Sequence, residues 1–191
     1  MSTSSPSAFS RHVALSSALS AVTPHSTESS VSILWTNICI AFFPLESGFK
    51  FCSKQTVRRQ DMDVDYVIFQ MSLVVPSIPD PQDAPSFTEN DILIVQCKRP
   101  SKDTPDEWES ARLQLAQHCE GNTNPTRRIF GATAIGTKVK FWRYEHPTLA
   151  PLFPKVDTYD LLEGHSGYQA EQCLEYMRDN GWNWIQSPMR A

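Results

Sequence analysis

The stretch DILIVQCKRP, residues 91–100, decides how the fold is interpreted. A run of apolar residues typical of a buried strand leads into a glutamine, a cysteine and a lysine before a proline ends it. Because successive strand residues point to opposite faces, Gln96 and Lys98 share one face, and Val95 and Cys97 share the other. The pattern predicts a buried strand whose polar residues either surface at its end or form a site.

A helix and two strands are predicted before this stretch. Residues 28–43 carry apolar side chains near helical spacing, and Ser26 or Thr27 is available as the N-cap. Residues 48–59 and 63–75 alternate in polarity and are rich in β-branched and aromatic residues. They predict two strands of a hairpin joined by a short turn.

A proline-rich segment, residues 76–90, separates this hairpin from the quoted strand. Proline fits neither a helix interior nor a central strand. We therefore expect a loop, of a length that is usually functional or disordered in a compact domain.

The clearest helix signal follows the quoted strand, over residues 105–120. Thr104 is placed to cap this helix, Pro105 occupies its first position, and Gly121 stands where it should end. The polar residues Gln114 and His118 lie one turn apart on its flank.

Two further strands and a last helix complete the pattern. Residues 127–145 predict two strands around a turn near Gly136, and residues 166–181 predict a helix that ends at Gly181. The predicted order is αβββαββα. This is an α/β fold with a central mixed sheet of four to five strands flanked by helices.

Composition narrows the class of protein. The 191 residues fit one domain with one flexible segment, and no run approaches the roughly 20 apolar residues of a membrane helix. A net charge of −4 argues against a surface that coats nucleic acid throughout, so such binding would need a local basic patch. The five cysteines form no C-x-x-C pair, which favours free thiols inside the cell, in the cytoplasm or nucleus.

The N-terminal segment, residues 1–27, differs from the rest in composition. It is rich in serine, and the first acidic residue of the chain is Glu28. We expect a disordered tail, of which residues 1–25 can be removed without loss of folding, or a mitochondrial-type transit peptide, or a poor secretory signal. The folded domain is then expected to span residues 28–191.

A carboxylate joins Gln96 and Lys98 if the predicted strands are neighbours. Asp65 interrupts an apolar strand, where a carboxylate is costly unless it is paired. Asp65, Gln96 and Lys98 would then converge at one edge of the sheet. Carboxylate and amide oxygens suit Mg²⁺ or Mn²⁺, and a lysine beside the metal can orient a bound water and stabilise charge on a phosphate.

These strands resemble a known family. DYVIF (residues 65–69) and ILIVQCKRP (92–100), followed by a helix bearing QLAQH (114–118), are similar to the PD-(D/E)xK nuclease superfamily, whose core is αβββαβ. VQCKR (95–99) resembles the Gln-x-Lys variant of Mrr-type restriction endonucleases and of the nuclease domains of type I restriction subunits. The resemblance covers residues 28–145 and implies a restriction-endonuclease-like fold.

The resemblance also implies an activity and roles for particular residues. The activity is Mg²⁺- or Mn²⁺-dependent hydrolysis of phosphodiester bonds in DNA or RNA. Lys98 is the implied catalytic lysine, and Asp65 and Gln96 are both catalytic and metal-binding. An additional metal ligand is expected from the first helix of the domain, and substrate contacts from the residues around the catalytic strand. These expected positions are Glu28 for the metal and Arg99, Gln114 and His118 for the substrate.

Two of the predicted metal-binding positions have an alternative residue elsewhere in the sequence. Val64 stands before Asp65 where the motif has proline, whereas Asp80 follows Pro79 and forms the literal Pro-Asp pair of the chain. Asp80 is therefore the rival metal ligand. Glu46 competes with Glu28 for the extra acidic position.

The sequence leaves three hypotheses about the function of the protein. The first is a nuclease that binds nucleic acid through a local basic patch, with no membrane association and an open oligomeric state that includes a homodimer. The second is a catalytically degenerate module that keeps the fold for binding, and the third is other chemistry in the same cleft. The candidate patch draws on Arg58, Arg59, Lys98, Arg99, Lys102, Arg127, Arg128, Lys138, Lys140 and Arg143.

Overall fold

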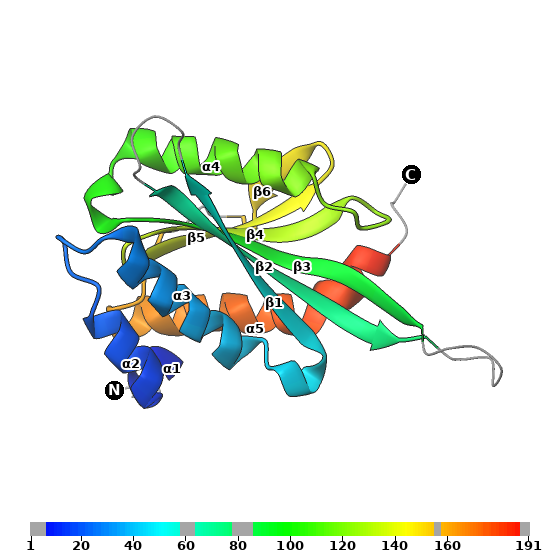
Figure 1. Cartoon of the computed structure of the whole chain (residues 1–191), viewed down its shortest axis with the longest axis horizontal. Coiled ribbons are helices and arrows are strands. Elements are labelled where there is room, and N and C mark those ends of the chain that lie inside the picture. Colours follow the sequence, from blue (N-terminus) through cyan, green and yellow to red (C-terminus); the bar gives the residue numbers. More distant parts are fainter. Residues whose placement is uncertain (1–6, 58–63, 78–85, 155–157, 188–191) are drawn as a thin grey trace.

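The structure is a computed structural model that describes residues 7–57, 64–77, 86–154 and 158–187. The side chains of residues 54–57, 64 and 65 also lie outside the description. Within these residues the chain forms an α/β fold with helices on both faces of one mixed sheet (Figure 1). No helix in the described ranges is both long enough and apolar enough to cross a bilayer.

One sheet organises the fold. Its described strands run in the order β1-β2-β3-β4-β5-β6, with β7 paired to β5. β3 and β4 are parallel, and the other pairs are antiparallel. The strands are β1 Phe49–Val57, β2 Val64–Pro76, β3 Phe87–Lys98, β4 Arg128–Ile135, β5 Lys138–Glu145, β6 Thr148–Pro151 and β7 Tyr159–Asp160.

Helices cover the two faces unequally. α4 lies alone on one face and connects the parallel strands β3 and β4, while α3 and α5 lie on the other face with α1 and α2 beside them (Figure 1). The helices are α1 Ala8–Arg11, α2 Val13–Ser20, α3 Glu28–Phe42, α4 Pro105–Glu120 and α5 Gly164–Gln186, with 3-10 turns η1 Leu45–Ser47 and η2 Pro100–Lys102.

The apolar core has two parts, one on each face of the sheet. The larger part joins α1, α2, α3 and α5 to alternate residues of the strands, such as Val67, Phe69 and Val95. The smaller part lies under α4 and contains Ile68, Ile94, Leu115, Cys119, Ile129, Trp142 and Tyr144. β3 contributes to both parts, so the residues at its end are covered on both faces.

The number of strands corrects the sequence expectation. We expected four to five, and the described residues form seven, because β6 and β7 were not predicted. Strands of four and two residues are too short to show an alternation of polarity. Both pair with β5 and cover its outer edge.

The proline-rich segment is shorter than predicted. β2 continues to Pro76 and β3 begins at Phe87, and these two residues are paired. β1 no longer flanks β2 there, since the register of β1 with β2 begins at Leu73. Proline is tolerated at such an edge because it lacks only an N–H that has no ladder partner. Residues 78–85, which include Asp80, lie outside the described residues.

The last helix does not end at Gly181. α5 continues to Gln186, and a Cβ at position 181 would lie 2.7 Å from Cγ2 of Ile92 in β3. Gly181 is therefore explained by close packing of the helix on the sheet. Glycine can end a helix or allow a helix to pack closely on a sheet, and its position in the sequence does not distinguish these two roles.

Residues 7–27, the described part of the N-terminal segment, pack on the domain, contrary to the expectation of a disordered tail up to residue 27. Phe9, Leu15 and Leu19 are buried, and the ring centroid of Phe9 lies 5.9 Å from that of Phe42 in α3. Glu171 of α5 accepts a hydrogen bond from the backbone N–H of Ala8 at 2.7 Å and pairs with Arg11, also at 2.7 Å. The domain core thus begins before residue 28.

Substitution of Phe9 tests this correction. Phe9→Ala removes a fully buried ring, and we expect it to lower the free energy of unfolding by about 3 kcal/mol. Val13→Ala is the control, since Val13 is 85% exposed and its loss should change stability by less than about 0.5 kcal/mol. Urea unfolding followed by circular dichroism measures both, and equal midpoints for the two variants would contradict the packed segment.

Candidate functional site

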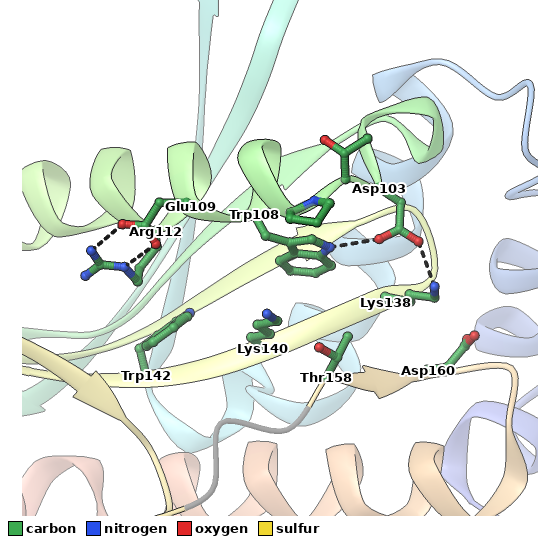
Figure 2. A pocket seen from close by; sticks show the side chains of 11 residues that line it. Asp103, Trp108, Glu109, Arg112, Lys138, Lys140, Trp142, Thr158 and Asp160 are labelled. Atoms are coloured by element: carbon green, nitrogen blue, oxygen red, sulfur yellow. Dashed lines mark hydrogen bonds and ion pairs between the residues drawn. The ribbon is translucent and has the colours of Figure 1, made fainter.

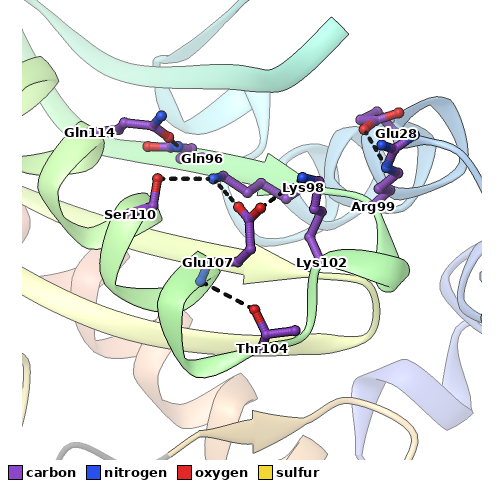
Figure 3. Close-up of polar contacts among 9 residues, drawn as sticks. All are labelled: Glu28, Gln96, Lys98, Arg99, Lys102, Thr104, Glu107, Ser110 and Gln114. Carbon is purple, nitrogen blue, oxygen red and sulfur yellow. Dashed lines mark hydrogen bonds and ion pairs between the residues drawn. The ribbon is translucent and has the colours of Figure 1, made fainter. Parts of the chain in front are cut away.

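Gln96 and Lys98 lie at the end of β3, on the face covered by α4. Gln96 is paired with Ile68 of β2 and with Thr133 of β4. Both side chains form hydrogen bonds with residues of α4, as Figure 3 shows. The strand ends here because η2 begins at Pro100, and Thr104 then starts α4 by accepting a hydrogen bond from the N–H of Glu107.

Gln96 is completely buried, and only one of the two polar groups of its side-chain amide has a hydrogen-bond partner among the described residues. Its exposed fraction is 0%, and its Nε2 donates to Oε1 of Gln114 at 2.5 Å. Its Oε1 has no hydrogen-bond partner among the described residues. A buried carbonyl oxygen without a partner is uncommon, because the desolvation of that oxygen is not compensated.

Lys98 is also buried and is held by an ion pair. The residue is 1% exposed, and its Nζ lies 2.8 Å from Oε2 of Glu107 and 3.4 Å from Oγ of Ser110. The other carboxylate oxygen of Glu107, Oε1, lies 2.7 Å from Nζ of Lys102. One carboxylate therefore serves two ammonium groups, so these three side chains carry a net positive charge.

The carboxylate of Glu107 is kept ionised. Hydrogen bonds from Lys102 and from Lys98 lower the pKa of Glu107 below its ordinary value of 4.5, against the smaller opposing effect of burial. Both lysines favour the charged carboxylate, so Glu107 is an acceptor at neutral pH.

The structure separates other predicted residues from this cluster or leaves them undescribed. Glu28, at the start of α3, lies with its Oε1 3.5 Å from Nε of Arg99, so these two residues pair with each other (Figure 3). Glu46 lies in η1, next to the end of β1 that pairs with Leu73 and far along β2 from Ile68. Asp65 belongs to β2, but its side chain lies outside the described residues.

His118 lies one turn beyond Gln114 on α4. Its ring packs edge-on against Tyr66 of β2, with centroids 6.0 Å apart. It also lines a pocket of about 570 Å³ with Gln70, Asp91 and Asn122. In that pocket Oδ1 of Asp91 accepts hydrogen bonds from Gln70 at 2.6 Å and from Ser72 at 2.8 Å.

Sequence reasoning missed Glu107 and Ser110, and it named Lys102 only as part of the basic patch. A signal for the first two was present, because Glu107, Ser110 and Gln114 recur at helical spacing and form a polar flank of α4. Glu107 stands three residues after its N-cap, where a glutamate commonly caps the helix, and here it binds lysines instead.

Some of the predicted basic residues are paired with carboxylates. Arg128 pairs with Glu145, and Lys138 pairs with Asp103 at 2.7 Å. Residues 58 and 59 lie outside the described ranges. Pairing of this kind reduces the positive potential that a continuous patch would present to phosphates.

Comparison with models of protein families, with curated proteins and with solved structures found no match. Within the described residues, no group of three or more His, Cys, Asp or Glu side chains is placed to hold a metal ion. A metal site that includes Gln96 would use an amide oxygen as a ligand. Oε1 of Gln96, which has no partner among the described residues, is a hard oxygen ligand of the type that Mg²⁺ accepts. The donor type at Gln96 therefore fits such a cation.

The Glu107 ion pairs give a prediction about pH. A lowered carboxylate pKa contributes stability that is fully present above pH 4.5 and is lost as the pH falls through the lower pKa of the folded state. Glu107→Gln leaves the ammonium of Lys98 buried without its counter-ion, and we expect a loss of about 2 kcal/mol at pH 7. That loss should shrink progressively below pH 4.5.

The control for this experiment is Glu109→Gln. Glu109 lies on the same helix and pairs with Arg112 on the exposed surface. Surface pairs contribute little, so this variant should unfold at nearly the same temperature as the wild type. Thermal unfolding of the three proteins between pH 3 and pH 7 compares them, and equal losses for both variants would contradict a structural role of the buried pair.

Proposed function

We propose that this chain is a metal-dependent phosphodiesterase of the PD-(D/E)xK type that acts on nucleic acid. The observation that carries the proposal is the buried Oε1 of Gln96, which has no hydrogen-bond partner in the described part of the chain and lies beside Lys98 on the same face of β3. A buried carbonyl oxygen without a partner among the described residues is explained if this oxygen binds a metal ion.

The connectivity supports the same proposal. α3, the antiparallel strands β1, β2 and β3, the crossover helix α4 and the parallel strand β4 follow one another in the αβββαβ order. The residues of the Gln-x-Lys motif occupy the third strand of that order, and Gln114 occupies the crossover helix. The resemblance to the PD-(D/E)xK superfamily predicts the motif and Gln114 at these positions.

Each side chain of the cluster has a distinct task in this proposal. Gln114 accepts a hydrogen bond from Nε2 of Gln96, and in this orientation Oε1 of Gln96 has no partner among the described residues. Lys98, held by Glu107, supplies a positive charge for the scissile phosphate. Asp65 and Gln96 would hold the metal ion, which when bound polarises the phosphate and makes water more acidic.

A cleavage assay tests this function. Labelled single- and double-stranded DNA and RNA are incubated with the protein and Mg²⁺ or Mn²⁺. Lys98→Ala should lower the rate by at least about 100-fold, because the charge that stabilises the transition state is lost. Lys102→Ala is the matched control, since it removes the other lysine bound to Glu107 and should retain most of the activity.

The variants also define the contradictory outcomes. Cleavage that survives in Lys98→Ala and in Asp65→Ala would arise from another site or from a contaminant. Equal loss in Lys98→Ala and Lys102→Ala would mean that the whole ion-pair cluster is structural.

A second candidate function is a binding module that retains the fold without catalysis. The observation that favours it is the closed set of ion pairs, in which each oxygen of Glu107 already has a lysine and Lys98 is almost fully covered. A purely structural role, in which the ion pairs hold α4 on β3, is enough to explain such a cluster.

A thermal-shift titration distinguishes the two candidates. A ligand that binds only the folded state raises its stability, by about 2.7 kcal/mol at 100 times the dissociation constant. For the enzyme, Mn²⁺ or Mg²⁺ should raise Tm in the wild type and in Gln96→Glu, which adds a charged ligand. The increase should disappear in Asp65→Asn and persist in Asp80→Asn. No increase in the wild type, together with no cleavage, would favour the binding module.

A further inference from the structure

A separate cavity lies on the other flank of α4, between that helix and β5. Its volume is about 590 Å³, within the range of sites that hold small ligands. Trp108 and Arg112 line it from α4, and Lys138, Lys140 and Trp142 line it from alternate positions of β5. Asp160 of β7 also lines it, as Figure 2 shows.

Two of the positive charges in this cavity are paired, and a third is unpaired within the described residues. Lys138 pairs with Asp103 at 2.7 Å, and Arg112 pairs with Glu109 at 2.6 Å. Lys140 has no carboxylate within ion-pair distance among the described residues. Its Nζ lies 4.8 Å from the centre of the Trp108 ring instead, which holds the ammonium in the cavity by a cation–π contact. This ammonium is the group that an incoming anion would neutralise.

The cavity also offers a flat apolar surface and a hydrogen-bond acceptor. The indole of Trp108 is fixed by its Nε1, which donates to Asp103 at 2.8 Å. Asp160 receives hydrogen bonds from Thr137 and from the N–H of Leu162 at Oδ1, and its Oδ2 has none within the described part of the chain. A ligand that fills these positions carries an anion, a flat ring and a hydrogen-bond donor.

We propose that this cavity binds a nucleotide, with the phosphate at Lys140, the base against Trp108, and an amino or hydroxyl group at Asp160. Bases stack on aromatic side chains whatever their sequence, and an ammonium suits a phosphate. Inorganic phosphate would leave the ring and the carboxylate unused, and an aromatic carboxylate would leave Asp160 without a donor. The site is separate from Gln96 and Lys98 and does not depend on cleavage.

Isothermal titration with adenosine 5′-monophosphate in EDTA tests the site without any metal. The nucleotide should bind the wild type, whereas inorganic phosphate and adenosine should each bind at least about tenfold more weakly, since each lacks one part of the ligand. Lys140→Gln should weaken nucleotide binding at least about tenfold. Trp108→Leu should weaken the nucleotide and adenosine alike. A 5′-phosphorylated oligonucleotide run in parallel distinguishes a free nucleotide from a strand end by which binds more tightly.

Matched variants decide the outcome. Arg143→Gln makes the same change of charge on β5 at an exposed position that does not line the cavity, and this variant should bind the nucleotide normally. Absence of nucleotide binding, an equal effect of Lys140→Gln and Arg143→Gln, or equal affinity for inorganic phosphate would overturn the inference. Nucleotide binding without cleavage would overturn only the proposed function, and metal-dependent cleavage without nucleotide binding would overturn only this inference.

Discussion

Two polar side chains buried on a strand that is otherwise apolar constrain how α4 packs on the sheet. Gln96 and Lys98 lie between β2 and β4 and are covered by the helix, so their polar atoms need partners there. α4 supplies Gln114, Ser110 and Glu107 at helical spacing. Leu115 and Cys119, on the neighbouring stripe of the same helix, complete the apolar contact with the sheet. The helix that connects β3 to β4 is thus oriented by the residues of β3 itself.

Local signals predicted the central part of the fold well. The Thr104 and Pro105 start of α4 and the alternation in β1, β2 and β5 are properties of adjacent residues, so they can be recognised without tertiary information. β6 and β7 could not be predicted, because strands so short exist only through their pairing with β5. Gly181 misled for a related reason, since the Ile92 side chain that explains it is 89 residues away in sequence.

The N-terminal segment shows why composition is an incomplete guide to order. Its serines lower the mean hydropathy, and its two helices are only four and eight residues long. Order comes from long-range contacts: Phe9 packs on Phe42, and Glu171 binds both the N–H of Ala8 and the side chain of Arg11. In the candidate site, Gln96, Lys98 and Gln114 were identified from sequence. Their ion-pair partner Glu107 was not, since only the structure shows which strand residues its helical flank meets.

α4 therefore presents two different polar flanks to the same sheet. One flank neutralises and holds the buried groups of β3, and its hydrogen bonds leave a single oxygen, Oε1 of Gln96, unused. The other flank carries Trp108 and Arg112 toward β5, where Lys140 stands without a carboxylate in the described part of the chain. An unused buried acceptor suits a cation, and an unpaired ammonium beside an indole suits an anion with a flat ring. Both groups are in contact with side chains of the same helix, Gln96 through Gln114 and Lys140 through Trp108.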